Sequence, residues 1–427
     1  MLKTFNFEKL PIVEIVNEII IDATKNRASD IHIDPFNDVL KIRIRIDGTL
    51  IDYATVPNDY KKNLVTRIKI IAGMNITENR LPQDGAIKTS LNGIPLDMRV
   101  SSLPTNNGEK IVIRILNYTM SSGGLENLGL SQKNLEKIKK LIKMPNGIIL
   151  VAGATGSGKS TTVYSMLQIL NTVSKNVITV EDPVEMKIAG INQVQVMSDI
   201  GLTFGNTLRS ILRQDPDIIM IGEIRDDETA RIAVRASITG HLVLSTIHTN
   251  NSLNTIERLL DMEVERYLLG SALTGIISQR LVKRLCPKCR TSRATTPYEK
   301  ILFEKVLHQE VNEVYTPHGC SECINGYTGR IALHEILEIN QDVRDAITNN
   351  VRKSELRDLV YNKSDVTSLL QDGLEKVVAG LTSVDEILRV IDVEDDIGEE
   401  DTEIKNAFIG KITNDAVNNQ VEEIETL

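Results

Sequence analysis

The sequence has no tryptophan, only 4% aromatic residues and only four cysteines among its 427 residues. Scarce aromatics and the lack of an evident basic face argue against a dedicated nucleic-acid binder, because such proteins stack bases on aromatic rings and follow phosphates with positive charge. No apolar run approaches the roughly 20 residues of a membrane-spanning helix, and the N-terminus does not resemble a signal peptide. We therefore expect a cytoplasmic protein with no direct nucleic-acid partner.

Negative charge is concentrated at one end of the chain. The net charge is -9, yet residues 392–427 alone hold 12 acidic and 2 basic residues, so the other 391 residues sum to +1. This segment also has few large apolar residues, which predicts an acidic, disordered tail over 392–427. The remaining chain is long enough for two or three domains that each bury a core.

The first part of the chain predicts an α+β domain over residues 1–118. Apolar residues at helical spacing open it, and the alternating segment VLKIRIRIDGTLIDY predicts two strands around a turn at Asp47-Gly48. A helix over about 59–73 and strands near 85–100 and 109–116 follow. A Ser/Gly cluster then predicts a linker, which we assign to 119–128.

From residue 129 the pattern changes to helices that alternate with short apolar strands. The strands are GIILVAG, VITVEDP, DIIMIGE and LVLSTIH. This alternation predicts a parallel sheet covered on both faces by helices, as in nucleotide hydrolases. The α/β domain is assigned to 129–391, with a cysteine-bearing insertion at 285–325 and a helical C-terminal part.

A phosphate-binding loop is the most specific motif in the chain. It fits G-x-x-x-x-G-K-[ST], follows a buried strand and opens a helix. Backbone N–H groups and the helix N-terminus suit ATP phosphates, Lys159 reaches the β and γ phosphates, and Ser160 offers a hydroxyl to Mg²⁺. The predicted nucleotide-binding residues are Gly153, Ala154, Thr155, Gly156, Ser157, Gly158, Lys159, Ser160 and Thr161.

Acidic residues are expected beside this loop. The strand DIIMIG ends in Glu223, the candidate that orients and activates the attacking water. Gly222 stands where many such hydrolases carry Asp, so another carboxylate must support the metal ion. Glu181, Asp182 and Glu185 are candidates, because the ends of parallel strands meet at one edge of a sheet. The alternative is that these three are solvated loop charges.

Two histidines flank the strand LVLSTI. A lone histidine is more often structural than catalytic. His248, at the carboxyl end of the strand, is the better candidate for sensing the γ-phosphate through a hydrogen bond, and His241 precedes the strand.

All four cysteines fall in two C-x-x-C pairs separated by 30 residues: Cys286, Cys289, Cys320 and Cys323. Disulfides rarely persist in the cytosol, so the pairs predict one tetrahedral, structural Zn²⁺ site. The residues between the pairs are expected to form a loop or helices. Reduced, unliganded thiols and a redox pair are the alternatives.

Taken together, these motifs resemble the secretion ATPases of type II secretion and type IV pilus systems, in particular their assembly branch. The resemblance covers about residues 11–391. It rests on the phosphate loop, the four cysteines and the segments ASDIHIDP, RIDG, LPQDG, DMRVS, GEKIVIR, EDPVE, LRQDPD, GEIRD and TGH.

This resemblance implies a PAS-like N-terminal domain joined flexibly to a RecA-like ATPase domain. It also implies a homohexamer with nucleotide sites between the two domains. The motor would act on an inner-membrane platform protein that adds pilin-like subunits, so the protein would be peripheral at the inner face of the cell membrane.

The family's functional residues carry over position by position. Glu181 to Glu185 match its aspartate box, Glu223 its catalytic carboxylate, and His241 and His248 its histidine box. Arg99 and Arg114 match arginines that reach the phosphates across a domain interface, and Arg209, Arg213 and Arg225 match basic residues that line the site. Arginine suits this role because its planar, permanently charged fork stabilises charge on phosphoryl oxygens.

Several alternatives remain open at this point. Many assembly ATPases carry a further N-terminal domain that docks a membrane partner, whereas this sequence begins almost at the PAS-like module. The cysteines favour an assembly motor over a retraction motor. A motor for DNA uptake or substrate secretion, a nucleic-acid translocase and a non-hydrolysing scaffold are the other functions, the last fitting poorly with both Lys159 and Glu223 in place.

Overall fold

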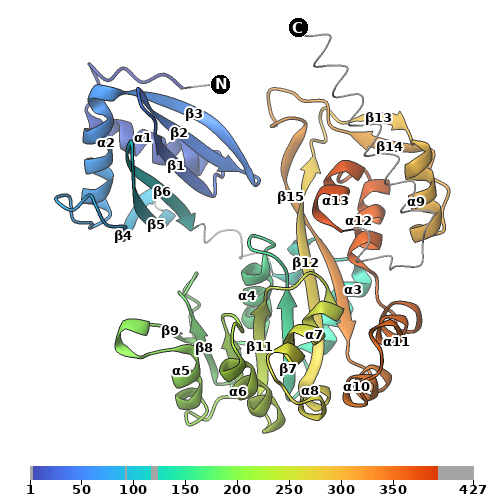
Figure 1. Ribbon diagram of the computed structural model, residues 1–427. Helices are drawn as coiled ribbons and strands as arrows, with labels where there is room; N and C mark the ends of the chain where they lie inside the picture. The colour runs from blue at the N-terminus through green and yellow to red at the C-terminus, as the bar shows by residue number, and fades with distance from the viewer. Residues whose placement is uncertain (1–2, 92–93, 117–123, 393–427) are drawn as a thin grey trace. The chain divides into compact units, whose positions relative to one another are not determined.

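The computed structural model describes residues 3–91, 94–116 and 124–392. It divides the chain into two compact units, Met1–Met120 and Ser121–Leu427 (Figure 1). Almost all of the predicted acidic tail, and the first part of the predicted linker, lie outside the described residues.

The first unit is an antiparallel sheet with two helices. Its strands follow the order β3-β2-β1-β6-β5-β4. The segment expected as one strand near 85–100 is two strands, and Asn92-Gly93 stands between them in the sequence. The elements are α1 (Ile12–Lys25), β1 (Asp30–Pro35), β2 (Val39–Ile46), β3 (Thr49–Pro57), α2 (Asn58–Ile71), β4 (Gln83–Leu91), β5 (Ile94–Thr105) and β6 (Gly108–Leu116).

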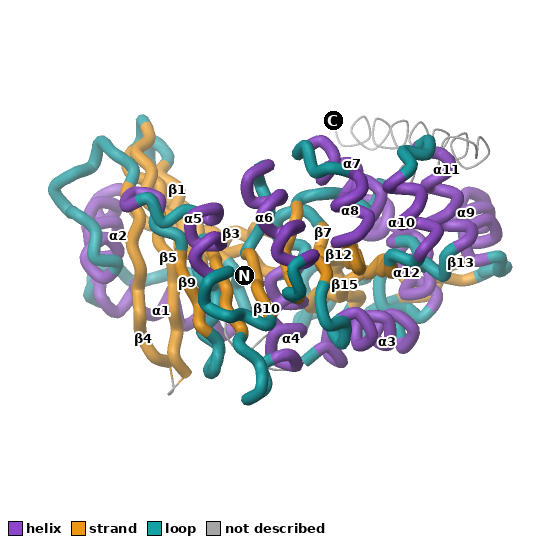
Figure 2. The backbone as a smooth tube through the Cα atoms, turned by 90° about the horizontal axis from the view of Figure 1, so that it is seen from below, coloured by secondary structure: helices purple, strands orange, loops and turns teal. Residues whose placement is uncertain are grey.

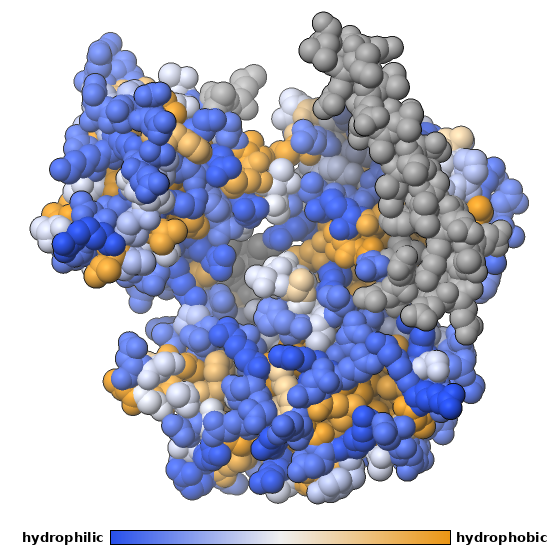
Figure 3. Space-filling view, viewed as in Figure 1, coloured by the Kyte–Doolittle hydropathy of each residue, from blue (hydrophilic) through white to orange (hydrophobic). Residues whose placement is uncertain are grey.

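Apolar residues alternate along most of these strands, with a register shift where β2 pairs with β3, and they give the sheet one apolar face. Ile31 and Ile113 are buried in a core with Ile15 of α1 and Leu64 of α2, so both helices cover this face (Figure 2). Neighbouring residues on the strands, Arg114 among them, point to the opposite, polar face. In Figure 3 the visible surface of this unit is mainly hydrophilic with scattered hydrophobic residues, as expected when the apolar face is internal.

The second unit is built on a sheet with the order β15-β12-β7-β11-β10-β8-β9. The strands from β12 to β9 are parallel, and β15 is antiparallel to β12, which confirms the predicted parallel sheet. The elements are η2 (Leu125–Leu128), α3 (Gln132–Leu141), β7 (Gly147–Ala152), α4 (Lys159–Leu170), β8 (Val177–Glu181), β9 (Asn192–Gln195), η3 (Ser198–Ile200), α5 (Phe204–Ile211), β10 (Ile218–Ile221), α6 (Asp227–Ile238), β11 (Leu242–Ile247), α7 (Ser252–Asp261), α8 (Arg266–Ala272), β12 (Leu273–Leu285), β13 (Thr291–Ala294), α9 (Pro297–Leu307), β14 (Glu313–Thr316), β15 (Tyr327–Glu338), α10 (Gln341–Thr348), α11 (Lys353–Asp358), η4 (Leu359–Lys363), α12 (Leu369–Val378) and α13 (Val384–Val390).

Both faces of this sheet are buried. Along β7, Ile149 and Val151 pack in one core with α3 and α4, whereas Ile148 and Leu150 pack in another with α5, α6, α7 and α8. A strand covered on both faces needs apolar residues at every position, which explains the continuous apolar runs in the sequence.

Two segments differ in detail from the sequence-based expectation. Leu125 of η2 is fully buried in the core formed with α3 and α4, so residues 125–128 of the predicted linker pack on the second unit. Between the cysteine pairs lie the paired strands β13 and β14 with α9, not only loop or helix. Among the described residues, no helix is both long and apolar enough to cross a bilayer.

Candidate functional site

The phosphate-binding loop joins the end of β7 at Ala152 to the start of α4 at Lys159. Two of its glycines have backbone conformations that other residues rarely adopt, and neighbouring atoms leave no room for a side chain at either. Gly153 and Gly158 have positive φ angles of 157° and 90°. A Cβ at Gly153 would lie 2.6 Å from the backbone oxygen of Gln279, and one at Gly158 would lie 2.6 Å from its Nε2. Only glycine allows the loop to fold this closely over the neighbouring strand.

Lys159 lies against the inside of this loop. Its ammonium donates hydrogen bonds to the backbone oxygens of Gly153 at 2.7 Å and Ala154 at 3.1 Å. Burial lowers the pKa of Lys159 to about 8, and the negative charge of Glu223 opposes this shift. Ser160 follows in the first turn of α4 and is exposed, so its hydroxyl is accessible to a metal ion.

Glu223 and His248 follow neighbouring parallel strands, β10 and β11, at the same edge of the sheet as the loop. The Nε2 atom of His248 lies 3.4 Å from Oε2 of Glu223, and Arg225 donates to Oε1 of the same carboxylate. Burial lowers the pKa of His248, and the positive charge of Lys159 adds to this effect, so the imidazole is neutral at pH 7. The edge thus combines a carboxylate, a neutral imidazole and two cations.

The segment around Glu223 is held by backbone contacts. The amide of Ile224 donates to the oxygen of Thr246 at 2.9 Å, and the Thr246 hydroxyl donates to the oxygen of Gly222 at 2.7 Å. A Cβ at Gly222 would lie 3.3 Å from Cα of Glu181. Close approach of β8 therefore favours glycine at this position.

Glu181 is buried and fully engaged. Its carboxylate accepts hydrogen bonds from the hydroxyl of Tyr164, from Oγ1 of Thr179 at 2.5 Å and from Nε2 of Gln193 at 3.1 Å. Tyr164 and Gln193 anchor the end of β8 to α4 and β9, and Thr179 adds a bond within β8. Tyr164 was not among the predicted site residues, because no motif includes it and it stands between Val163 and Ser165 in a buried part of α4.

Glu185 and Asp182, the other predicted acidic residues of this segment, have different surroundings. The Tyr164 hydroxyl accepts a hydrogen bond from the amide of Glu185 at 3.1 Å. Asp182 is exposed, and its negative charge helps to raise the pKa of Arg225. Asp182 is therefore the member of this segment whose charge acts on the pair formed by Arg225 and Glu223.

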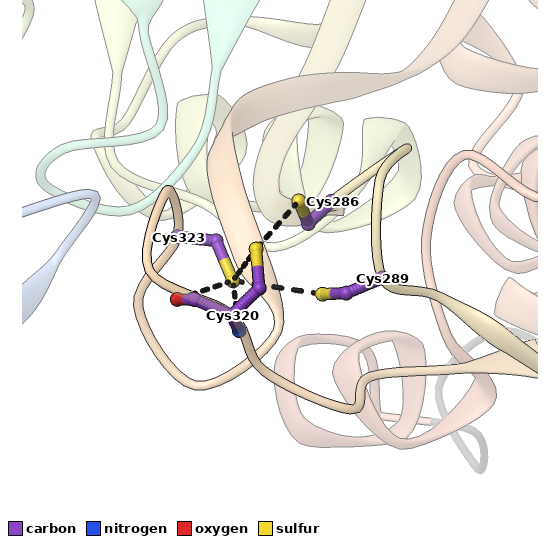
Figure 4. A group of neighbouring side chains, drawn as sticks. All are labelled: Cys286, Cys289, Cys320 and Cys323. Carbon is purple, nitrogen blue, oxygen red and sulfur yellow. Dashed lines mark hydrogen bonds between the residues drawn. The ribbon is translucent and has the colours of Figure 1, made fainter.

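The four cysteines come together after the last residue of β12 and before the first residue of β15 (Figure 4). All four sulfur atoms lie within 4.8 Å of one another. The Sγ separations are 3.9 Å for Cys286 and Cys320, 3.6 Å for Cys289 and Cys323, and 3.5 Å for Cys320 and Cys323. All four are free thiols.

These separations fit a tetrahedral thiolate site. Four sulfurs at about 2.3 Å from a Zn²⁺ ion lie about 3.8 Å from one another. The amides of Gly319 and Cys320 also donate to the sulfurs of Cys289 and Cys323, at 3.4 Å and 3.2 Å. Such donors stabilise thiolates. The donor set and its spacing therefore suit a closed, structural zinc site.

Comparison with known proteins agrees with this geometry. A family profile described as "Type II/IV secretion system protein" matches residues 6–389. The putative type II secretion system protein E of Escherichia coli K12 is 46% identical over 382 residues, which cover 89% of this chain and 77% of the relative. The chain belongs to the type II/IV secretion system protein family. The type II secretion system ATPase E of Vibrio cholerae is 42% identical over 381 residues, covering 89% and 75%.

Solved structures show the same fold as this secretion-family chain. The pilus retraction motor PilT with bound ADP is 27% identical, with a TM-score of 0.60 and coverage of 89% of this chain and 97% of PilT. The ATPase DotB of Legionella pneumophila is 23% identical, with a TM-score of 0.69 and coverage of 91% and 98%. The resemblance inferred from the motifs is thereby confirmed.

His241 does not lie with the other predicted residues of this family member. It precedes β11, where its backbone oxygen accepts from the amide of Gly147 at 3.2 Å and its Nδ1 lies 2.8 Å from the oxygen of Ala236. The phosphate loop follows the other end of β7. The six residues of β11 span about 20 Å, so within one chain His241 is remote from the loop.

The predicted arginines fall into separate groups. Arg225 contacts Glu223, as described. Arg209 on α5 pairs with Glu228 on α6, and Arg213 donates to the backbone oxygen of Arg209 at 2.7 Å. The contacts of Arg209 and Arg213 described here do not reach the phosphate loop.

Arg99 and Arg114 belong to the first unit. They are direct cross-strand partners on β5 and β6. Nε of Arg114 donates to Asp30 at 3.0 Å, and 64% of the Arg114 side chain is exposed. Their opposition in the register concentrates positive charge on the polar face of the antiparallel sheet.

Proposed function

We propose that this chain is the ATP-hydrolysing motor subunit of a type II secretion or type IV pilus assembly machine. The observation that carries the proposal is the edge of the parallel sheet, where Lys159 inside the phosphate loop faces Glu223 and His248. The Vibrio cholerae relative is named an ATPase, and PilT is a motor solved with ADP, which supports the same activity here.

The residues at this edge account for ATP hydrolysis in chemical terms. Backbone amides of the loop and the N-terminus of α4 bind the phosphates, and Lys159 neutralises charge on the β and γ groups. Mg²⁺, held through Ser160, would stabilise charge on the phosphoryl oxygens. The carboxylate of Glu223 orients a water molecule for in-line attack on the γ-phosphorus and accepts its proton, and ADP leaves with the electrons of the broken bond.

The neighbours of Glu223 control its carboxylate. Arg225 holds Oε1, which leaves Oε2 to face the water. His248 is neutral and close to Oε2, so it restrains this oxygen without neutralising it. Asp182 balances the charge of Arg225.

Assembly into a homohexamer is part of the proposal. Arg99 and Arg114 would complete a nucleotide site from the first unit, a PAS-like domain whose exposed face carries them. His241, remote from the loop of its own chain, would act at an interface or have a structural role. Arg209 and Arg213 would line the nucleotide site only after Arg209 leaves Glu228 and Arg213 leaves the backbone oxygen of Arg209.

The proposal includes a cellular setting for this motor. The four cysteines would hold a structural Zn²⁺, and this module favours an assembly motor over a retraction motor. The ring would lie in the cytoplasm at the inner face of the membrane, where it would drive an inner-membrane platform protein. Nucleic acid is not expected as a direct partner.

The test is ATP turnover per molecule of full-length protein, measured against protein concentration with Mg²⁺ in excess. A motor whose sites are completed by neighbours shows turnover that rises with concentration until rings are saturated. Lys159→Ala abolishes turnover, and sizing of the same samples reports the ring. Turnover that survives Lys159→Ala would overturn the assignment of the loop, and turnover from a sized monomer would overturn the ring.

A further inference from the structure

Gln279 is a buried polar residue beneath the phosphate loop that the motifs do not include. Its side chain is 2% exposed. It belongs to β12, which pairs in parallel with β7 so that Ser278 lies opposite Ala152. One residue further along, Gln279 therefore lies beside Gly153, where the loop begins.

The amide of Gln279 joins the loop to the helix that follows. Its Nε2 donates to the backbone oxygen of Ser157 at 2.8 Å, and its Oε1 accepts from the hydroxyl of Thr162 at 2.6 Å. Thr162 is fully buried in the first turn of α4. One side chain thus satisfies a loop carbonyl and a helix hydroxyl, in a buried place where each would otherwise lose a partner.

The bond to Ser157 has a consequence for the next amide. In a trans peptide the C=O and N–H groups point in opposite directions. Because Gln279 holds the Ser157 oxygen beneath the loop, the N–H of Gly158 is directed away from β12. This is the side on which loop amides converge on phosphate.

We propose that Gln279 is a positioning residue for nucleotide binding, which orients the peptide between Ser157 and Gly158 before the nucleotide arrives. It contacts neither phosphate nor metal. The inference rests on the proposed nucleotide site and adds a residue of β12 that lies 122 positions from Ser157 in the chain. Preorganisation of this kind increases affinity, because the cost of ordering the loop is met during folding.

The variants separate this role from simple core filling. Gln279→Met keeps the volume and removes both hydrogen bonds. Gln279→Glu keeps an acceptor for Thr162 but places an oxygen against the Ser157 carbonyl. Thr162→Val removes one bond only. The matched control is Ser278→Ala, which deletes a fully buried hydroxyl next to Gln279 on the same strand, where its partner is Ser252.

Two measurements on the full-length variants test the proposal. We expect Gln279→Met and Gln279→Glu to weaken ATP binding, and to raise KM, by about tenfold, with a smaller change in kcat, and Thr162→Val to have a smaller effect. Ser278→Ala should bind ATP normally even where it lowers Tm. Hydrogen exchange in the peptide containing Gly158 should be faster in Gln279→Met without nucleotide.

The outcomes distinguish this inference from the proposed function. If the unaltered protein binds no ATP, the proposed function fails. If it binds ATP, Lys159→Ala does not, and Gln279→Met and Gln279→Glu match the unaltered protein in affinity and KM, then only the role of Gln279 is overturned. Loss of affinity in Ser278→Ala equal to that in Gln279→Met would also overturn it, since any weakening of β12 would then suffice. If Gln279→Met fails to fold, Thr162→Val and Gln279→Glu decide the question by the same criteria.

Discussion

The phosphate loop and the cysteine cluster both lie next to β12, but they differ in what holds their side chains in place. Gln279 of β12 lies beneath the loop, and Cys286 follows the last residue of that strand. Buried side chains of the protein hold the phosphate loop in place. Of the four cysteines, in contrast, only Cys286 is buried, and Cys320 is exposed. The fold itself shapes the first site, and the second depends on what its thiols bind.

Removal of the proposed Zn²⁺ should distinguish these two sites most strongly. A structural Zn²⁺ contributes on the order of 10 kcal/mol to the folding of small zinc modules. We expect chelation, or the double substitution of Cys320 and Cys323 by Ser, to abolish hydrogen-exchange protection in 286–325. Nucleotide binding by the loop should persist, as measured by calorimetry on the same samples.

Ser321→Ala is the matched control for the cysteine substitutions, since Ser321 is exposed in the same turn and offers no sulfur ligand. Metal content, measured by atomic absorption, should stay at one ion per chain in this variant and fall in the double variant. If ATP binding is lost when residues 286–325 lose their protection, then unfolding at the cysteines disturbs the phosphate loop through β12, and the two sites are not independent.

Substitution of Glu223, the proposed catalytic carboxylate, tests the phosphate loop without disturbing the cysteine cluster. Glu223→Gln should lower kcat by about 10²-fold to 10⁴-fold, because the water loses its proton acceptor. ATP affinity and metal content should be retained. Glu263→Gln makes the same chemical change at an exposed ion pair with Arg231 and should leave kcat unchanged. Turnover near the original rate in Glu223→Gln would remove it from its role.

The contrast also explains what the sequence could predict. The loop is one contiguous motif between a buried strand and a helix, so its residues and context could be recognised, and two C-x-x-C pairs were enough to group the cysteines. Gln279 and Tyr164 could not be found from the sequence. The partners of Gln279 depend on the pairing of β12 with β7, two strands far apart in the chain, and Tyr164 bonds to Glu181 because the fold brings α4 to the end of β8.

Two other differences have equally physical causes. His241 matches a family motif, but the motif does not say where the residue lies in the fold. His241 precedes β11 and His248 follows it, so the two histidines lie at opposite edges of the parallel sheet. Leu125 stands in a Ser/Gly-rich stretch that predicts a linker. Its burial depends on apolar side chains of α3 and α4, which local composition does not report.

The pH dependence of ATP binding gives the smallest and most specific effect. Burial lowers the pKa of Lys159 to about 8, below its ordinary value of 10.5, so above about pH 8 the free protein holds a neutral amine. Between about pH 8 and pH 10.5, Lys159 binds more protons in the unfolded chain than in the folded chain. The contribution of Lys159 to the free energy of unfolding therefore rises with pH in this range. Bound phosphates require the charged form, so ATP affinity should fall above about pH 8, by at most about tenfold per pH unit.

Proton uptake isolates this effect from other titrations. Calorimetry in buffers of different ionisation enthalpy should show uptake of nearly one proton per ATP bound at about pH 9 and little at about pH 7. Mg-ATP is fully ionised at both values, and the lowered pKa of His248 keeps its imidazole neutral at both. The uptake should be the same after the metal is removed from the cysteines, because their module makes no contact with Lys159 among the described hydrogen bonds. Equal proton uptake at the two pH values would show that Lys159 is not the group whose charge ATP binding restores.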